Sequence, residues 1–149
     1  MREIKLRVWD NFRKKFAKQI TTFKFDRCGN INLVVYLDRA NKTKEITEQE
    51  KIYTNDFKLM QYTGLKDKNG RDIYEGDIIS IKADYLSEFN SESILPCEIV
   101  AFEDGAFGTY DKKRTLFVSF KEMIDKSDGI EFEIIGNVFE NPELLESAK

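Results

Sequence analysis

A mainly β fold with only short helices is predicted by three features of this sequence. Stretches in which apolar and polar residues alternate recur along the chain, which is the pattern of strands buried on one face. Turn-forming pairs such as Asp104-Gly105 separate these stretches at the short spacing of hairpins. Aromatic residues make up 13% of the 149 residues, so the chain has the bulky side chains that one core needs.

The beginning of the chain predicts a half-buried strand followed by a turn. Residues 3–9 alternate between apolar and charged side chains, and the short polar side chains of Asp10 and Asn11 then favour a turn. Residues 12–19 are ambiguous, because they carry a helical spacing of aromatic residues between neighbours that favour strands.

A β-hairpin is predicted next. Residues 20–26 and 31–37 form its strands, and residues 28–30 form its turn. Residues 38–56 are polar and predict a surface excursion, with a helical turn near 47–53 where acidic residues suit a helix start.

From Phe57 onward, short strands joined by tight turns are predicted. Asn69-Gly70 suits a type I′ turn, and Gly76-Asp77 resembles the turn that leads into a strand of SH3-like barrels. The predicted strands are residues 57–63, 78–82, 98–103, 106–110, 115–120 and 130–139.

The connections in this second part differ in character. Residues 84–96 are polar and predict a long mobile loop, and a short helix is predicted near 121–126. At the end of the chain, Asn141 can cap a helix, Pro142 suits its first position and Leu144 anchors it.

Many strands at short spacing are best accommodated by a partly closed barrel, because closure hides the edges of a sheet. We therefore predict one domain, 1–149, with an N-terminal β-hairpin module, a small SH3-like or partly closed β-barrel and a short C-terminal helix. The change of pattern near Phe57 suggests a subdivision into 1–56 and 57–149.

The composition argues against several kinds of enzyme. The chain contains no His, which excludes hydrolases of the Ser-His and Cys-His types. Its eight Gly never follow the spacing of a phosphate-binding loop, so no catalytic site and no cofactor are predicted. An enzyme that depends on carboxylate or Lys chemistry remains an open third hypothesis.

No metal site is predicted either. The densest acidic cluster has the wrong spacing for a calcium loop and is interleaved with Lys and Arg, so we interpret it as a solvated turn. Cys28 and Cys97 lack the paired spacing of a zinc site. This cluster consists of Asp67, Asn69, Asp72, Glu75 and Asp77.

A cytoplasmic location in a bacterial host cell is expected. The N-terminus lacks the basic and apolar regions of a secretory signal, and the apolar runs are far shorter than the roughly 20 residues that span a bilayer.

Positive charge is concentrated at the start of the chain. Residues 1–24 carry eight Lys or Arg against Glu3 and Asp10, a net charge of +6, which leaves −9 for the rest because the total is −3. Three interpretations are open: a solvated strand face, a patch for an anionic partner, and an arm that docks on an acidic surface of another copy. The candidate contact arm consists of Arg2, Lys5, Arg7, Arg13, Lys14, Lys15 and Lys18.

Aromatic residues in the second part have two interpretations. Alternation predicts that most of them fill the barrel, but a stacking surface for single-stranded nucleic acid would use the same residue types. The set consists of Phe102, Phe107, Tyr110, Phe117 and Phe120.

Three segments resemble the YopX family of phage and prophage proteins. The hallmark segment of that family resembles residues 59–79, its first strand resembles residues 4–10, and its closing strand and helix resemble residues 134–145. The resemblance implies a mostly β protein and gives no activity to carry over to any residue. The motif residues, with a structural or an interaction role, are Gln61, Tyr62, Thr63, Gly64, Asp67, Gly70, Tyr74, Glu75, Gly76 and Asp77.

These observations favour a phage accessory protein that acts without catalysis. We expect it to work through protein interaction, with a phage or host protein as partner, and to form a homo-oligomer. The alternative hypothesis is a small-barrel module that binds nucleic acid.

Overall fold

The computed structural model describes residues 3–38, 48–53, 56–88 and 93–146, and within them the mainly β prediction is confirmed. The chain forms two compact units. We call Leu6–Met60 the hairpin unit, and Met1–Lys5 together with Gln61–Lys149 the barrel unit. The units divide inside β6 (Phe57–Lys66), a few residues after the predicted boundary at 56/57.

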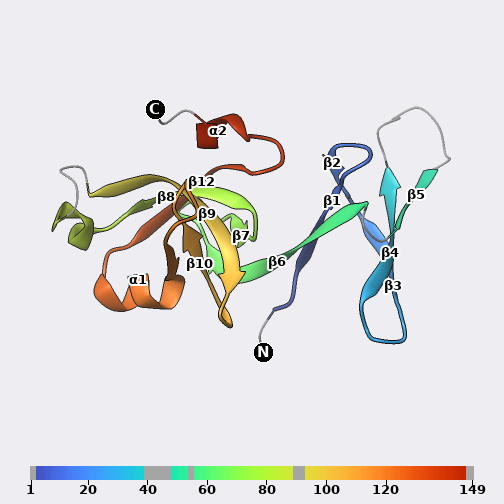
Figure 1. Cartoon of the computed structure of the whole chain (residues 1–149), viewed down its shortest axis with the longest axis horizontal. Coiled ribbons are helices and arrows are strands. Elements are labelled where there is room, and N and C mark those ends of the chain that lie inside the picture. Colours follow the sequence, from blue (N-terminus) through green and yellow to red (C-terminus); the bar gives the residue numbers. More distant parts are fainter. Residues whose placement is uncertain (1–2, 39–47, 54–55, 89–92, 147–149) are drawn as a thin grey trace. The chain divides into compact units, whose positions relative to one another are not determined.

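The hairpin unit contains two small groups of strands (Figure 1). In one, β1 lies between β2 and the first part of β6, and in the other, β4 lies between β3 and β5. Its core consists of Val8, Val34, Tyr36 and Ile52. The strands are β1 (Leu6–Asp10), β2 (Lys15–Phe16), β3 (Ile20–Phe25), β4 (Ile31–Asp38) and β5 (Glu48–Tyr53).

The predicted hairpin of β3 and β4 is confirmed, but the predicted helical turn near 47–53 is wrong. Glu48–Tyr53 is strand β5, which pairs with β4 so that Ile52 lies opposite Val34. The side chain of Ile52 is buried in the core, which explains why this polar segment forms a strand. Residues 39–47 and 54–55 of the predicted excursion lie outside the described residues.

The barrel unit is built on a curled, half-barrel sheet of five antiparallel strands (Figure 1). Their order is β11-β10-β9-β8-β12, and the second part of β6 pairs with β7. The strands are β7 (Asp72–Tyr74), β8 (Asp77–Lys82), β9 (Ile94–Glu103), β10 (Ala106–Tyr110), β11 (Phe117–Ser119) and β12 (Glu131–Asn137). The helices are η1 (Asp84–Glu88), α1 (Phe120–Lys126) and α2 (Glu143–Glu146).

One side of the curled sheet holds the core of this unit. Ile79 and Ile81 of β8 and Val100 of β9 are buried there, and Phe120 and Met123 of α1 cover them. Burial of such large side chains supplies most of the stability that a small sheet has. None of the helices in the described ranges is long and apolar enough to cross a membrane.

The loop predicted for residues 84–96 is largely wrong. Asp84–Glu88 forms the 3₁₀ helix η1, and β9 begins at Ile94. Leu86, which is 4% exposed, packs in the core and explains why this polar segment is ordered. Residues 89–92 lie outside the described residues.

Two hairpin turns show why a pair of residue types does not determine the turn. The predicted hairpin at Asp104-Gly105 is confirmed, and the φ values of 49° and 79° at these two residues are those of a type I′ turn. The type I′ prediction for Asn69-Gly70 is wrong, because only Gly70 has a positive φ, at 80°. The Gly70 N–H donates to the carbonyl oxygen of Asp67, 2.9 Å away. The central residues of the turn are therefore Lys68 and Asn69, and Gly70 is its last residue.

The C-terminal helix is present at Glu143–Glu146. The Asn141 side chain accepts a hydrogen bond from the Asn137 N–H at 3.2 Å at the end of β12, and the Asn141 carbonyl accepts one from the Leu144 N–H at 3.1 Å. A Cβ atom at Gly136 would lie 2.9 Å from Leu144 Cδ1, and glycine therefore allows the predicted anchor Leu144 to pack closely.

The five aromatic residues of the second part, for which a core position and an exposed stacking surface are the two interpretations, lie in different environments. Phe120 is in the core, and Phe107 packs against it. Tyr110 and Phe117 are half-buried, with ring centres 5.2 Å apart. Phe102 is 52% exposed, so the expectation of a core position does not hold for this residue.

Candidate functional site

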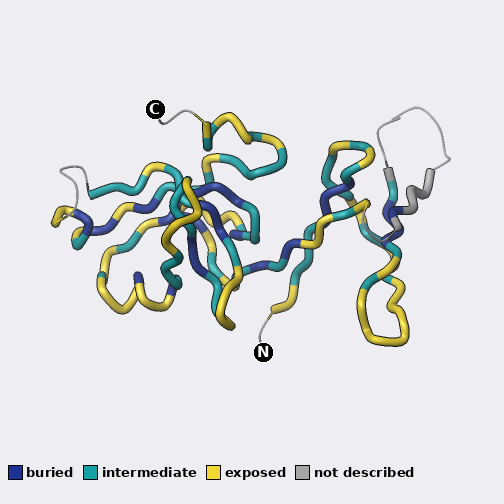
Figure 2. Tube along the Cα trace, viewed as in Figure 1, coloured by how far each residue is buried: buried dark blue, intermediate teal, exposed yellow. Residues whose placement is uncertain are grey.

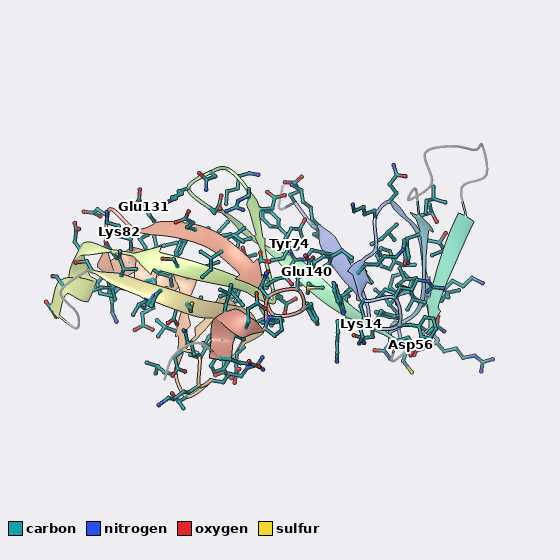
Figure 3. All side chains as sticks on the ribbon, turned by 90° about the horizontal axis from the view of Figure 1, so that it is seen from above. Lys14, Asp56, Tyr74, Lys82, Glu131 and Glu140 are labelled. Carbon is teal, nitrogen blue, oxygen red and sulfur yellow. The ribbon has the colours of Figure 1, made fainter. Side chains whose placement is uncertain are left out.

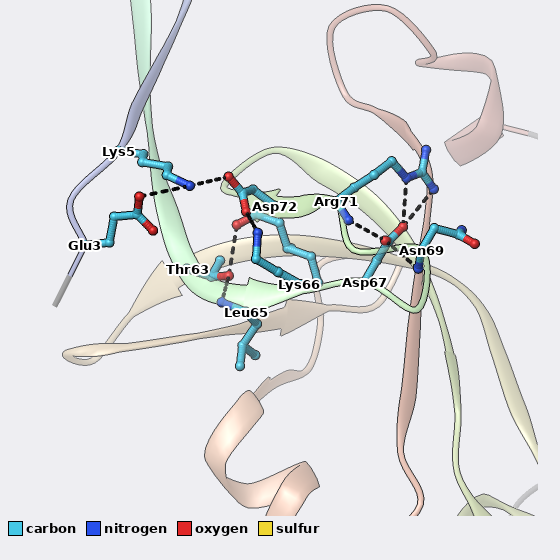
Figure 4. Close-up of polar contacts among 10 residues, drawn as sticks. Glu3, Lys5, Thr63, Leu65, Lys66, Asp67, Asn69, Arg71 and Asp72 are labelled. Carbon is cyan, nitrogen blue, oxygen red and sulfur yellow. Dashed lines mark hydrogen bonds and ion pairs between the residues drawn. The ribbon is translucent and has the colours of Figure 1, made fainter.

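The hallmark segment forms a hairpin loop around one buried carboxylate (Figure 4). Asp67 Oδ1 accepts hydrogen bonds from the N–H groups of Asn69 and Arg71, each at 2.9 Å. Asp67 Oδ2 accepts one from Arg71 Nε at 2.9 Å and one from the Ile134 N–H at 3.3 Å. The Asp67 side chain is 0% exposed. Every bond of this buried charge therefore comes from the protein.

These bonds set the ionisation of Asp67. Burial alone would raise the pKa of Asp67, but the hydrogen bonds from the Arg71 backbone, the Arg71 guanidinium and the Ile134 N–H outweigh it and lower the pKa to about 2. Asp67 is therefore a carboxylate at neutral pH and acts as an acceptor only.

The same loop covers the outer edge of β12. The Lys68 N–H donates to the Phe132 carbonyl at 2.8 Å, and Arg71 Nη2 donates to the Ile134 carbonyl at 2.7 Å. Together with the bond from the Ile134 N–H to Asp67, these contacts satisfy polar groups that an edge strand would otherwise present for pairing. We call Asp67, Lys68 and Arg71 the loop latch.

A second polar cluster joins the two strands of the same hairpin to the start of the chain. Asp72 forms ion pairs with Lys5 at 2.7 Å and with Lys66 at 2.5 Å, and Lys5 also pairs with Glu3 at 3.2 Å (Figure 4). The hydrogen bond from Lys5 is the main cause of the lowered pKa of Asp72. The Lys5 ammonium also lies 5.1 Å from the centre of the Tyr62 ring.

Other motif residues hold the backbone of the hairpin. The Thr63 hydroxyl donates to the Ile73 carbonyl at 2.9 Å, and Glu75 accepts from the Gln61 N–H at 2.7 Å. Gly64 and Gly76 have φ values of 90° and 81°, which suit glycine. The rings of Tyr62 and Tyr74 are 5.7 Å apart, and Asp77 accepts from the Tyr74 N–H at 2.8 Å.

The carboxylates of the acidic cluster around this loop accept hydrogen bonds from side chains and backbone groups of the protein. The carboxylates of Asp67 and Asp72 bind Arg and Lys side chains, and Asp77 binds a backbone N–H. In the part of the chain that the structure describes, no group of three or more Cys, Asp or Glu is arranged to hold a metal ion.

The residues of the predicted basic arm lie in different places. Arg2 lies outside the described residues, and Lys5 belongs to the Asp72 cluster. Arg7 lies in β1, with its guanidinium 4.7 Å from the centre of the Phe16 ring and a hydrogen bond to the sulfur of Met60. The remaining four residues belong to the β1–β2 hairpin or follow it directly: Arg13, Lys14, Lys15 and Lys18.

The turn of the β1–β2 hairpin is built around another buried carboxylate, that of Asp10. Asp10 Oδ1 accepts from the N–H groups of Phe12 and Arg13, each at 2.9 Å. Asp10 Oδ2 accepts from Arg13 Nη1 and from the Tyr36 hydroxyl, each also at 2.9 Å. Burial favours a higher pKa for Asp10, but these hydrogen bonds outweigh it and lower the pKa.

The hairpin tip, which we define as residues 11–14, projects a large apolar side chain. Phe12 is 80% exposed, and the guanidinium carbon of Arg13 lies 5.6 Å from the centre of its ring. Lys14, labelled in Figure 3, is exposed. The Asn11 N–H donates to the Asp56 carbonyl at 2.8 Å. The tip is therefore ordered and exposed at once.

Charge separates between the two units. The hairpin unit carries twelve Lys or Arg and seven Asp or Glu, a net charge of +5. The barrel unit carries the other twelve and twenty, a net charge of −8. The asymmetry that the sequence places at residues 1–24 is thus a property of whole folded units.

Glu98 is a further feature, which the sequence reasoning missed. Burial, and to a smaller extent the negative charge of Asp111, raise the pKa of Glu98 to about 7, although a hydrogen bond from the Thr109 hydroxyl at 3.5 Å opposes this change. Alternation along β9 could have identified this residue, because it places Glu98 on the same face as the buried Val100.

Comparisons with known proteins agree over nearly the whole chain. A family model described as YopX protein matches residues 5–146. The crystal structure of protein EF1440 from Enterococcus faecalis is similar, with 30% sequence identity, a TM-score of 0.60, and 97% of this chain and 99% of that chain covered. The crystal structure of protein yopX from Bacillus subtilis is similar in fold, with 22% identity, a TM-score of 0.59, and 97% and 98% covered. A search of curated proteins found no match.

Proposed function

This chain belongs to the YopX protein family, and we propose that it is a phage accessory protein that binds other proteins, including further copies of itself, rather than catalysing a reaction. It would act in the cytoplasm of a bacterial host cell. The observation that carries this proposal is the division of charge, with +5 on the hairpin unit and −8 on the barrel unit.

Opposite charges on two units favour contact between different surfaces of two copies. The hairpin unit of one molecule attracts the barrel unit of the next, which is a heterologous contact. Repetition of such a contact forms a ring if the rotation closes. Attraction of this kind speeds encounter and selects partners, and salt weakens it.

Sedimentation velocity at low and high salt tests the proposal. At about 50 mM salt we expect a species heavier than one 17.5 kDa chain, and at about 500 mM salt we expect dissociation, because screening shortens the range of the attraction. A single monomeric species at both salt concentrations would refute self-association.

Binding of single-stranded nucleic acid is the second candidate. It is favoured by the exposed Phe12, which is followed by Arg13 and Lys14, because stacking surfaces combine an aromatic ring with basic side chains. A titration with labelled single-stranded and double-stranded oligonucleotides at several salt concentrations would decide, because phosphate contacts make affinity fall steeply with salt. No binding at low salt would remove this candidate.

A further inference from the structure

We infer that the hairpin tip, with Phe12 at its apex, is the surface by which one copy of this chain docks on the barrel unit of a second copy. This inference rests on the proposed function and adds a docking surface to it. Three observations carry it: the order of the tip, the exposure of its aromatic side chain and the charge that surrounds it.

The tip is ordered before any partner binds. The buried carboxylate of Asp10 holds the N–H groups of Phe12 and Arg13, and the Asp10 carbonyl accepts from the Lys14 N–H at 2.9 Å. The Tyr36 hydroxyl fixes this carboxylate to β4. A surface that is already ordered loses little conformational entropy on binding, which favours its use as a contact.

Phe12 has the character of an interface anchor. It is 80% exposed, while the other rings of the same hairpin, Trp9 and Phe16, are buried or half-buried. The Arg13 guanidinium lies beside the ring, and aromatic residues and Arg dominate the binding energy of protein interfaces. Among the rings of the hairpin unit whose exposure the structure describes, Phe12 is thus the most exposed, and it stands on a fixed turn.

The charge around the tip identifies the occupant as a second copy. Lys14 is exposed within the tip and Lys18 is exposed just after β2, on a unit whose net charge is +5. The barrel unit of the same chain has a net charge of −8, so every copy carries both a basic unit and an acidic one.

The hairpin of β3 and β4 offers a matched control in the same unit. Phe25 is 61% exposed, and Lys24 is exposed next to it. The loop that joins β3 and β4 is exposed along its length (Figure 2). Asp26 holds this turn with hydrogen bonds from the N–H groups of Cys28 and Asn30, but Asp26 is exposed, unlike Asp10. Equivalent substitutions here change the same residue types on a different tip.

The experiment compares the dissociation constant of self-association for the intact chain, for Phe12→Ser and Lys14→Glu at the tip, and for the controls Phe25→Ser and Lys24→Glu. Loss of an aromatic anchor should weaken association by about tenfold to a hundredfold, whereas loss of Phe25 should leave it nearly unchanged. Lys14→Glu should weaken it about tenfold at low salt and much less at high salt.

A mixing experiment tests the heterologous geometry. A labelled chain that carries both Phe12→Ser and Lys14→Glu keeps its acidic barrel unit, so it should still bind the intact chain while failing to associate with itself. Unchanged urea unfolding of each variant shows that the fold persists, since the altered side chains are exposed.

The outcomes separate the two levels of the proposal. An intact chain that is monomeric at low salt would refute the self-association part of the proposed function, on which this inference rests. If the control substitutions weaken self-association as much as the tip substitutions do, the tip is not the docking surface. That result would overturn the inference and leave the proposed function standing. Loss of oligonucleotide binding in Phe12→Ser with unchanged self-association would assign the tip to nucleic acid and also overturn the inference.

Discussion

Two turns of this chain, one in each unit, are organised by a buried aspartate, and their carboxylates make corresponding bonds. Asp10 and Asp67 each accept two nearby backbone N–H groups and one Arg guanidinium. They differ in the fourth bond, because Asp10 accepts from the side-chain hydroxyl of Tyr36 and Asp67 accepts from the backbone N–H of Ile134.

The fourth bond decides what each turn does for its unit. The bond to Ile134 joins the loop latch to the edge of β12, so Asp67 helps to close the sheet. The bond from Tyr36 fixes a hairpin whose tip stays exposed, so Asp10 holds a projecting surface in place. The same kind of hydrogen-bonded turn therefore helps to close the sheet in the barrel unit and holds an exposed tip in place in the hairpin unit.

Asp67→Asn has the largest expected effect. The amide keeps one acceptor oxygen but turns an NH₂ group toward donors, so the free energy of unfolding should fall by about 3 kcal/mol. Urea unfolding measures this loss, and Asp26→Asn, which alters an exposed carboxylate with similar local bonds, serves as the control. Equal losses in both variants would show that burial and the bond to β12 contribute nothing.

Asp10→Asn should lower the free energy of unfolding by about 2 kcal/mol, because the Tyr36 hydroxyl can rotate and accept a hydrogen bond from the new NH₂ group, whereas the Ile134 N–H beside Asp67 can only donate. Tyr36→Phe removes only the fourth bond and should cost about 1 kcal/mol. The same urea titration measures both. A larger loss of unfolding free energy for Asp10→Asn than for Asp67→Asn would contradict the expectation that the turn at Asp67 contributes more to stability.

Glu98 extends the comparison to a carboxylate that lacks such donors. Its folded pKa of about 7 lies above its ordinary value of 4.5, so its contribution to stability is full below pH 4.5 and is lost as pH rises toward 7. After allowance for partial exposure, Glu98→Gln should raise the free energy of unfolding by about 1–2 kcal/mol at pH 8 and leave it unchanged near pH 4.5.

Asp67 should show the opposite dependence on pH. Its folded pKa of about 2 lies below its ordinary value of 3.8, so its contribution is full above pH 3.8 and is lost as pH falls toward 2. Unfolding curves collected across both ranges, with Asp67→Asn and Glu98→Gln as references, test the two signs separately. A contribution of the same sign from both residues would contradict this account.

The smallest expected effects concern the two residues with positive φ that complete the turns. Gly70 has φ of 80°, and Gly70→Ala should cost about 1 kcal/mol through backbone strain, since the site has open space for a methyl group. Lys14 has φ of 55°, and Lys14→Gly should add about 0.5 kcal/mol by relieving strain. Thermal unfolding resolves these changes, and a stabilising Gly70→Ala would contradict the turn geometry.

Local pattern predicted the parts of this fold that depend on neighbours in sequence. The alternation in residues 20–26 and 31–37 and the pair Asp104-Gly105 predicted confirmed strands and a confirmed turn. Strand β5 and helix η1 were missed, because each is ordered by burial of one residue, Ile52 or Leu86, in a core built from distant segments.

The sequence by itself determined that this chain is built of short strands and tight turns, that it lacks His chemistry, and that its hallmark segment places it in the YopX family. Only the tertiary structure decided that Asp67 latches β12, that Phe12 stays exposed on an ordered tip, and that charge separates by unit. The physical reason is that periodicity and turn chemistry act between neighbouring residues, whereas burial and ion pairing join residues far apart in the chain.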